Sequence, residues 1–191
     1  MIKIGIILGS TRPGRNGEAV ARWVLEQASR RTDATFDLID LAEHHLPAID
    51  EPVPPARGQY TNEHTKAWAR IVAQYDGYVI VTPEYNHSAP GVLKNALDRV
   101  YGEWNNKAAA FVSYGAQGGV RAVEQLRLTL SALQIAHVSA QVSLGLATDF
   151  VRFREFKPSD HQHGVLAGTL DQLITWSTAM ATIRQSAETT S

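Results

Sequence analysis

The stretch that decides the fold of this chain is Ile4-Gly5-Ile6-Ile7-Leu8-Gly9-Ser10-Thr11-Arg12-Pro13-Gly14-Arg15-Asn16-Gly17. It begins as an apolar run typical of a buried strand and ends as a polar, glycine-rich turn with two arginines. A helical pattern follows at once. Strand, loop and helix in this order point backbone N–H groups and a helix N-terminus at one spot, which is how many proteins bind anions. The stretch therefore predicts a phosphate site at the end of the first strand.

Strand and helix patterns alternate along the rest of the chain. Apolar, β-rich runs predict strands at residues 2–8, 35–39, 78–82, 108–113 and 136–144. Helical patterns predict helices at 18–31, 62–74, 90–101, 120–133 and 164–185. This alternation favours parallel βαβ units, and strands apolar on both faces favour helices on both sides of a sheet. We expect an α/β fold, a flavodoxin-like or Rossmann-like three-layer sandwich with a five-stranded parallel sheet. Segments 44–60 and 150–163 interrupt this alternation of strands and helices, and we expect them to be irregular connections.

The composition is that of a globular protein. The chain has 191 residues, 44% of them hydrophobic and 19% charged, so we expect one domain over residues 1–186 and a disordered tail at 187–191. A net charge of −1 argues against binding nucleic acid. Cysteine is absent, so redox chemistry would need a bound cofactor. The first apolar run is too short for a signal or membrane segment, so we expect a cytoplasmic protein that does not bind membranes.

Two well-known phosphate motifs do not fit the first loop. Gly9 and Gly14 have P-loop spacing, but Arg15-Asn16 stands where that motif needs Lys followed by Ser or Thr. The dinucleotide pattern G-x-G-x-x-G is also missing from this loop. The donors that remain suit one terminal phosphate, and they are Ser10, Thr11, Arg12, Asn16 and the N–H groups near Gly17. The alternative is an ordinary turn in which Ser10 or Asn16 only caps the helix.

Two further loops leave the carboxyl ends of predicted strands, where doubly wound sheets bind their ligands. In residues 83–91, Pro83 stiffens the chain, and Tyr85 and the backbone N–H groups of Glu84 to Asn86 could meet a flat heterocycle. Residues 113–119 contain three glycines, which let a backbone lie close to a ligand. The alternative for both loops is a connection that only starts the next helix. A mononucleotide with a planar ring would satisfy all three loops.

Three segments together carry a family signature. They are Leu8-Gly9-Ser10-Thr11-Arg12-Pro13-Gly14-Arg15, Thr82-Pro83-Glu84-Tyr85-Asn86-His87-Ser88-Ala89-Pro90-Gly91-Val92-Leu93-Lys94-Asn95-Ala96-Leu97-Asp98 and Ser113-Tyr114-Gly115-Ala116-Gln117-Gly118-Gly119. They closely resemble the NADPH-dependent FMN reductase family, which includes quinone, chromate and azo-dye reductases. The resemblance runs from residue 1 to about the end of the last strand. It implies a flavodoxin-like fold, non-covalent FMN, NADPH or NADH as hydride donor, and homodimers often paired into homotetramers.

The resemblance also implies which residues hold FMN. The phosphate would be surrounded by Ser10, Thr11, Arg12, Arg15, Asn16 and Gly17. The isoalloxazine would be bordered by Pro83, Glu84, Tyr85 and Asn86. The ribityl chain or the ring would be faced from the other side by Ser113, Tyr114, Gly115, Gly118 and Gly119. Many relatives have an aromatic residue where this chain has Arg99, which bears on the packing of that helix and on its subunit contact.

These residues predict an FMN-dependent NAD(P)H oxidoreductase. It would pass hydride from NAD(P)H through FMN to a quinone or similar small-molecule acceptor by a ping-pong mechanism. No catalytic side chain is expected, because the reactive centre is flavin N5 and the protein supplies orientation. Two alternatives remain, a flavodoxin-like electron carrier without its own NAD(P)H site and a phosphate-binding module without redox activity. The paired histidines fall in predicted loops without a metal-binding motif, so no metal site is expected.

Overall fold

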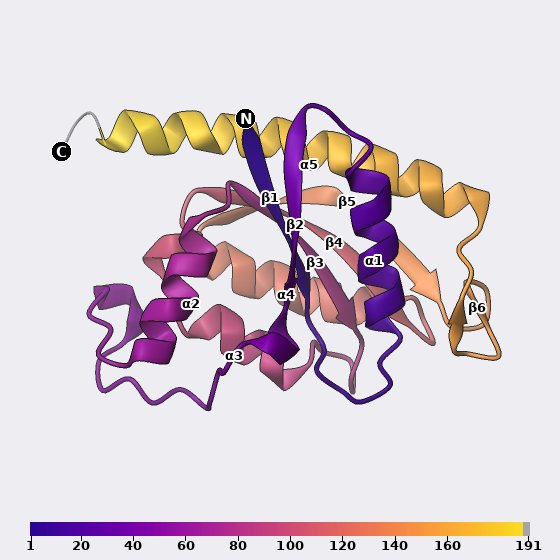
Figure 1. Ribbon diagram of the computed structural model, residues 1–191, viewed down its shortest axis with the longest axis horizontal. Helices are drawn as coiled ribbons and strands as arrows, with labels where there is room; N and C mark the ends of the chain where they lie inside the picture. Colours follow the sequence, from indigo (N-terminus) through magenta and orange to yellow (C-terminus); the bar gives the residue numbers. More distant parts are fainter. Residues whose placement is uncertain (189–191) are drawn as a thin grey trace.

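The central sheet has five parallel strands in the order β2-β1-β3-β4-β5 (Figure 1). The computed structural model describes residues 1–188. The strands are β1 (Ile2–Leu8), β2 (Ala34–Asp40), β3 (Gly77–Pro83), β4 (Lys107–Gly115) and β5 (Ile135–Gly145). This order is the flavodoxin-like one, which resolves the choice left open between the two doubly wound folds. The fold prediction is confirmed.

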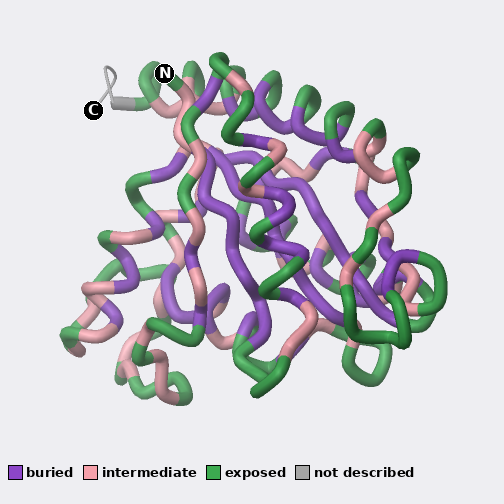
Figure 2. The backbone as a smooth tube through the Cα atoms, turned by 45° about the vertical axis from the view of Figure 1, so that its right-hand side comes forward, coloured by how far each residue is buried: buried purple, intermediate pink, exposed green. Residues whose placement is uncertain are grey.

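Helices cover both faces of the sheet. They are α1 (Gly17–Ala28), α2 (Glu63–Ala73), α3 (Gly91–Asp98), α4 (Val120–Ala132) and α5 (Asp160–Glu188). Side chains alternate along β1, so Ile4 and Ile6 pack with α1 and α5 while Ile7 packs with the other three helices. The inner strands β1, β3 and β4 are therefore buried on both sides, and Figure 2 shows them as buried segments at the centre of the molecule. Within residues 1–188, no helix is long and apolar enough to cross a bilayer.

The largest differences from the sequence prediction lie near the C-terminus. Segment 150–163 is not wholly irregular, because it contains a short antiparallel hairpin, β6 (Phe150–Val151) and β7 (Glu155–Phe156), and the first turn of α5. Two-residue strands are too short to show a period of two in the sequence. Helix α5 continues to Glu188 and runs past the end of the sheet in Figure 1. The rest of the expected tail, residues 189–191, lies outside the described residues.

A buried arginine holds the long connection between β2 and α2. This connection contains only two short 3₁₀ turns, η1 (Leu41–Glu43) and η2 (Pro55–Arg57). Arg99, at the end of α3, is 1% exposed and donates to the carbonyl of Pro47, to Asp50 Oδ1 at 3.2 Å and to Thr65 Oγ1 at 3.2 Å. Arg99 therefore anchors a loop of its own chain.

The amino-terminal edge of the sheet holds a buried lysine. Lys107, the first residue of β4, is 4% exposed. Its Nζ donates to the carbonyl of Val72 at 2.6 Å and to Tyr78 Oη at 3.3 Å. Burial, with a further contribution from the charge of Arg184, lowers the pKa of Lys107 to about 7. A lysine without a carboxylate partner at this depth works against the stability of the fold near neutral pH.

Candidate active site

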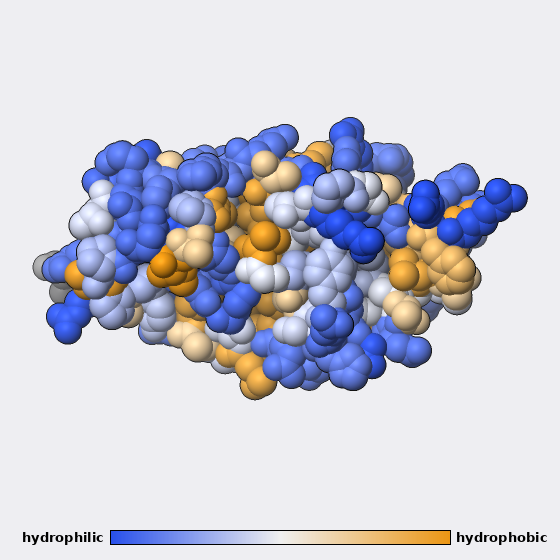
Figure 3. Space-filling model, turned by 90° about the horizontal axis from the view of Figure 1, so that it is seen from below, coloured by the Kyte–Doolittle hydropathy of each residue, from blue (hydrophilic) through white to orange (hydrophobic). Residues whose placement is uncertain are grey.

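The three loops singled out from the sequence meet at the carboxyl edge of the sheet. Ser10 Oγ, after β1, lies 3.1 Å from Tyr85 Oη, after β3. The backbone N–H of Glu84 donates to the carbonyl of Tyr114, at the end of β4, at 3.2 Å. Figure 3 looks onto this edge and shows hydrophobic side chains near its centre, between hydrophilic ones. The fold therefore brings the predicted site residues together.

The N-terminus of α1 is open to an anion. Asn16 occupies the N-cap position, but its side chain makes no capping hydrogen bond. It donates instead to the carbonyl of Phe153, at 2.9 Å. Asn16 therefore does not cap the helix with its side chain, and within residues 1–188, among the first-turn N–H groups only that of Gly17 has a side-chain partner, the hydroxyl of Tyr114. Gly17 is required here by packing, because a Cβ would lie 2.5 Å from Tyr114 Oη.

The two arginines of the first loop have different surroundings. Arg15 donates to the carbonyl of Ser10 and pairs with Asp40, and its side chain is only 12% exposed. Asp40 also caps η1 by accepting from the N–H of Ala42 at 2.9 Å. Arg15 thus fixes the shape of the loop. Arg12 is exposed and pairs with no acidic residue within 1–188, so its guanidinium is the one free to meet a phosphate.

The loop after β3 is a tight turn. Tyr85 N–H donates to the carbonyl of Ser88 at 2.8 Å, and Ser88 N–H donates back to Tyr85 at 3.0 Å. Asn86 and His87 have φ of 49° and 67°. The sequence predicts that the backbone N–H groups of Glu84 to Asn86 could all bind a ligand. Because the N–H groups of Glu84 and Tyr85 already donate to carbonyls of the protein, only the N–H of Asn86 is left for this role.

The carboxylate of Glu84 is held by α4. It is 7% exposed and pairs with Arg121, whose Nε lies 2.6 Å away and whose backbone N–H donates to it at 3.1 Å. Burial acts to raise the pKa of Glu84, but the hydrogen bonds and charge of Arg121 outweigh it and hold that pKa below its usual value. The ion pair therefore fixes the turn that contains Tyr85.

The glycine-rich loop after β4 is shaped by its own contacts. Ser113 Oγ donates to the carbonyl of Gly118 at 2.6 Å. Gly118 and Gly119 have φ of 68° and 75°, in the left-handed region that favours glycine. A Cβ on Gly119 would lie 2.8 Å from Ser113 Cβ. Tyr114 is buried, which raises its pKa above the usual range. Backbone conformation and packing at the entry to α4 thus account for Gly118 and Gly119, while their contact with a ligand stays a prediction.

A cleft of about 310 Å³ opens beside the first loop. Its lining is polar and apolar in nearly equal parts and consists of Thr11, Leu41, Ala42, His44, Leu46 and Val92. It lies where the connections after β1 and β2 meet the start of α3. No cluster of possible metal ligands occurs in the part of the chain that the structure describes.

Three residues that shape the site were missed from the sequence. They are Asp40, which pairs with Arg15; Arg121, which pairs with Glu84; and Phe153, whose carbonyl accepts from Asn16. Asp40 ends β2 and Arg121 lies in the first turn of α4, so their positions at the carboxyl edge follow from the fold. Their specific partners follow only from the packed structure.

Comparisons with known proteins identify the family of this chain. A family model described as NADPH-dependent FMN reductase matches residues 2–149. An NAD(P)H-dependent FMN reductase of Schizosaccharomyces pombe is 42% identical over 149 residues, which cover 77% of this chain and 74% of that protein. A 2-hydroxy-1,4-benzoquinone reductase of a Burkholderia species is 35% identical over 143 residues, covering 70% of this chain and 73% of its own.

The fold also has solved counterparts. The flavoenzyme FerB of Paracoccus denitrificans, an NAD(P)H:(acceptor) oxidoreductase, superposes with a TM-score of 0.74 over 94% of this chain and 99% of its own. At 21% identity, this match supports the fold alone. From the family model and the closely similar relatives, the chain belongs to the NADPH-dependent FMN reductase family and is an oxidoreductase that uses FMN with NAD(P)H as donor.

Proposed function

We propose that this enzyme passes hydride from NAD(P)H through FMN to a quinone or a similar small aromatic acceptor, in a ping-pong cycle. The observation that carries the proposal is the meeting of three loops at one edge, joined by the contact of Ser10 with Tyr85 and of Glu84 with Tyr114. A single binding site at this edge would suit two substrates that bind one after the other.

The residues present fit FMN. The uncapped N-terminus of α1, the free guanidinium of Arg12 and the hydroxyl of Thr11 would hold the phosphate. Pro83, Tyr85 and the N–H of Asn86 would border the ring. When bound, FMN supplies a two-electron carrier that accepts hydride from a nicotinamide and gives it to an acceptor.

The remaining residues of the site position these groups. The Glu84–Arg121 pair fixes the turn that presents the Asn86 N–H, and Arg15 fixes the loop that presents Arg12. Donors held in place by packing stabilise charge at a ring edge without reorganising, which is how such sites favour reduction. No side chain at the site needs to act as nucleophile or general base.

The acceptor class is proposed from the lining and from the relatives. The cleft beside the first loop combines the apolar side chains of Leu41, Leu46 and Val92 with the polar ones of Thr11 and His44, a mixture that suits a small aromatic molecule with polar substituents, such as a quinone. Relatives from Burkholderia and Pseudomonas putida are named as benzoquinone and quinone reductases. Assembly as a homodimer or homotetramer belongs to the same proposal, and light scattering of the FMN-loaded protein tests it.

Steady-state and anaerobic measurements test the function. The purified protein should be yellow, NADPH should bleach it without oxygen, and 1,4-benzoquinone should restore the colour. Initial rates with NADPH and 1,4-benzoquinone both varied should give parallel double-reciprocal lines. Converging lines would rule out the ping-pong cycle. Yellow protein that NADPH does not bleach would instead be an electron carrier, and protein that takes up no FMN would contradict the proposed site.

A further inference from the structure

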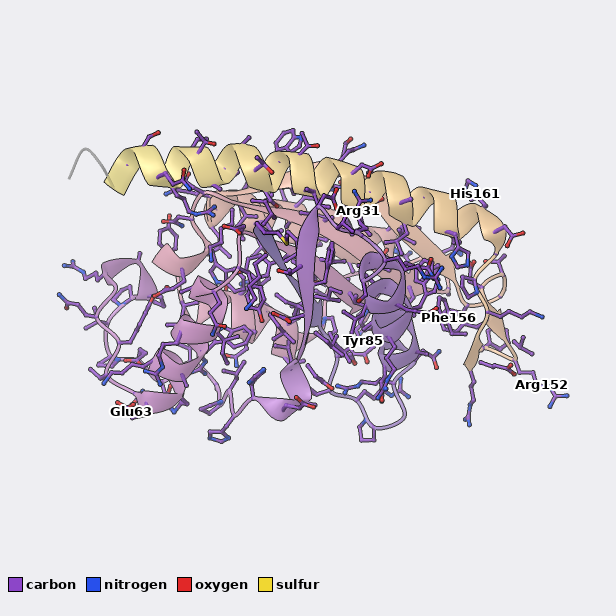
Figure 4. All side chains as sticks on the ribbon, turned by 45° about the horizontal axis from the view of Figure 1, so that its top comes forward. Arg31, Glu63, Tyr85, Arg152, Phe156 and His161 are labelled. Carbon is purple, nitrogen blue, oxygen red and sulfur yellow. The ribbon has the colours of Figure 1, made fainter. Side chains whose placement is uncertain are left out.

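The β6–β7 hairpin presents an aromatic ring between two unpaired arginines. Its turn spans residues 151–154 and is closed by the N–H of Arg154, which donates to the carbonyl of Val151 at 3.1 Å. Phe153 is 63% exposed at the tip. The side chains of Arg152 and Arg154 pair with no acidic group among residues 1–188, and Arg152 points away from the body in Figure 4.

The base of the hairpin is fixed while its tip is exposed. Phe150 is 5% exposed, and its ring centroid lies 5.1 Å from that of Phe156 and 6.3 Å from that of Tyr114. The Phe156 ring also lies 5.5 Å from that of Trp23 in α1. The N–H of Lys157 closes the base by donating to the carbonyl of Asp149 at 2.8 Å. The tip is thus held on a well-packed stem.

The two central residues of the turn have backbone angles that their side chains do not favour. Arg152 and Phe153 have φ of 50° and 61°. Positive φ at both central positions of a turn favours Asn-Gly, and a bulky aromatic residue rarely adopts it. Strained residues of this kind gather where side chains have a functional use. The choice of Arg and Phe at the tip therefore suggests that these side chains bind something.

The tip lies beside the proposed phosphate loop. The side-chain amide of Asn16, the residue just before α1, donates to the carbonyl of Phe153 at 2.9 Å. Arg12 belongs to the same loop, so basic groups without acidic partners flank this junction from both segments. Strongly hydrophilic and hydrophobic atoms adjoin at this end of the molecule in Figure 3. The family match ends at residue 149, so the hairpin lies outside it.

We propose that the hairpin binds the adenosine end of NADPH and makes the enzyme prefer NADPH to NADH. The face of Phe153 stacks on the adenine, because an exposed aromatic ring on a rigid support stacks on bases well. Arg152 and Arg154 bind the 2′-phosphate, which NADH lacks, through charge-assisted hydrogen bonds. The inference rests on the proposed function and on the placement of the FMN phosphate at the first loop. It goes beyond them because it assigns the adenosine end of NADPH to the β6–β7 hairpin.

Binding of 2′,5′-ADP to the FMN-loaded protein, measured by calorimetry, tests the proposal directly. The wild type should bind 2′,5′-ADP at least tenfold more tightly than 5′-AMP. Phe153→Asn removes the ring but keeps a residue that tolerates the left-handed turn, so it should weaken 2′,5′-ADP binding about tenfold while the melting temperature stays equal or rises. If Phe153 had only a structural role, the loss of 2′,5′-ADP affinity would be accompanied by a fall in melting temperature.

The arginines are tested by the double variant R152A/R154A. Its KM for NADPH should rise at least tenfold, its KM for NADH should change by less than about twofold, and its FMN affinity should not change. Arg57→Ala, at another exposed arginine without an acidic partner, is the matched control and should change none of these values.

Several outcomes would overturn the proposal. They are equal binding of 2′,5′-ADP and 5′-AMP by the wild type, unchanged 2′,5′-ADP affinity in both variants, or a loss of FMN affinity in place of NADPH affinity. Unchanged nucleotide binding with lost binding to phosphatidylserine vesicles would make the hairpin a membrane-docking element instead. The proposed function fails separately, because absent quinone reduction by the wild type leaves the nucleotide-binding result standing.

Discussion

Replacing the buried lysine at the amino-terminal edge should stabilise the protein at low pH. Lys107→Met removes the charge and shortens the side chain by one atom. Burial lowers the pKa of Lys107 from 10.5 to about 7 in the folded protein. At about 1.4 kcal/mol per pH unit, protonated Lys107 costs about 5 kcal/mol of unfolding free energy. The variant gives up two hydrogen bonds worth about 1 kcal/mol each, although Val72 keeps the hydroxyl of Tyr78 as a donor at 2.6 Å.

The sign of the effect depends on pH. Between about pH 7 and pH 10.5, the unfolded wild type binds more protons at Lys107 than the folded one, so its unfolding free energy rises with pH. Below about pH 7 the full destabilisation is present, and Lys107→Met should be more stable than wild type by about 3 kcal/mol. At pH 10 most of the destabilisation is gone, so the variant should be equal or less stable by about 1–2 kcal/mol.

Urea unfolding of the FMN-saturated protein at pH 6, 8 and 10 measures this difference. Far-UV circular dichroism should be the signal, with protein concentration held constant because assembly affects apparent stability. Lys66→Met, at an exposed lysine of α2, is the control and should shift stability by less than about 0.5 kcal/mol at every pH. A Lys107→Met protein less stable than wild type at pH 6, or with an effect independent of pH, would refute the reasoning.

Three further substitutions test the contacts at the site and around it. Arg12→Ala should weaken FMN binding about ten- to a hundredfold in a fluorescence titration of the apoprotein, since it removes one charge-assisted hydrogen bond to the phosphate; unchanged affinity would exclude Arg12 from the phosphate site. Glu84→Gln should lower the urea-derived unfolding free energy by about 1–3 kcal/mol at pH 7, and, because Arg121 holds the pKa of Glu84 below its usual value, the difference should fade on acidification. Arg99→Ala should cost about 2–5 kcal/mol, because it strips the partners from the connection after β2, and an unchanged melting temperature would contradict this role.

The sequence predicts the sheet well because its pattern reports burial directly. Strands that are largely apolar on both faces, as β3 and β4 are, need helices on both sides, and the chain supplies a helix after each strand. The edge at which the loops meet follows from parallel topology, so Ser10, Tyr85 and Tyr114 could be placed together before the structure was known.

What the sequence does not predict is how polar side chains pair across the fold. Arg15 pairs with Asp40, 25 residues away, and Glu84 with Arg121, 37 residues away. No local pattern encodes such pairs, so the support that Arg15 and Glu84 give to their loops could not be predicted, while their contacts with FMN stay predictions. The hairpin was missed for a related reason, since its strands are too short to show a period.

All strands of the sheet run the same way, so the molecule has two unlike rims. The rim at the strand ends carries the proposed site, while the rim at the strand starts carries Lys107, an ionisable group that weakens the fold. This weakness therefore lies away from the loops of the proposed site, so the protein can be stabilised by a change at Lys107 that leaves those loops untouched.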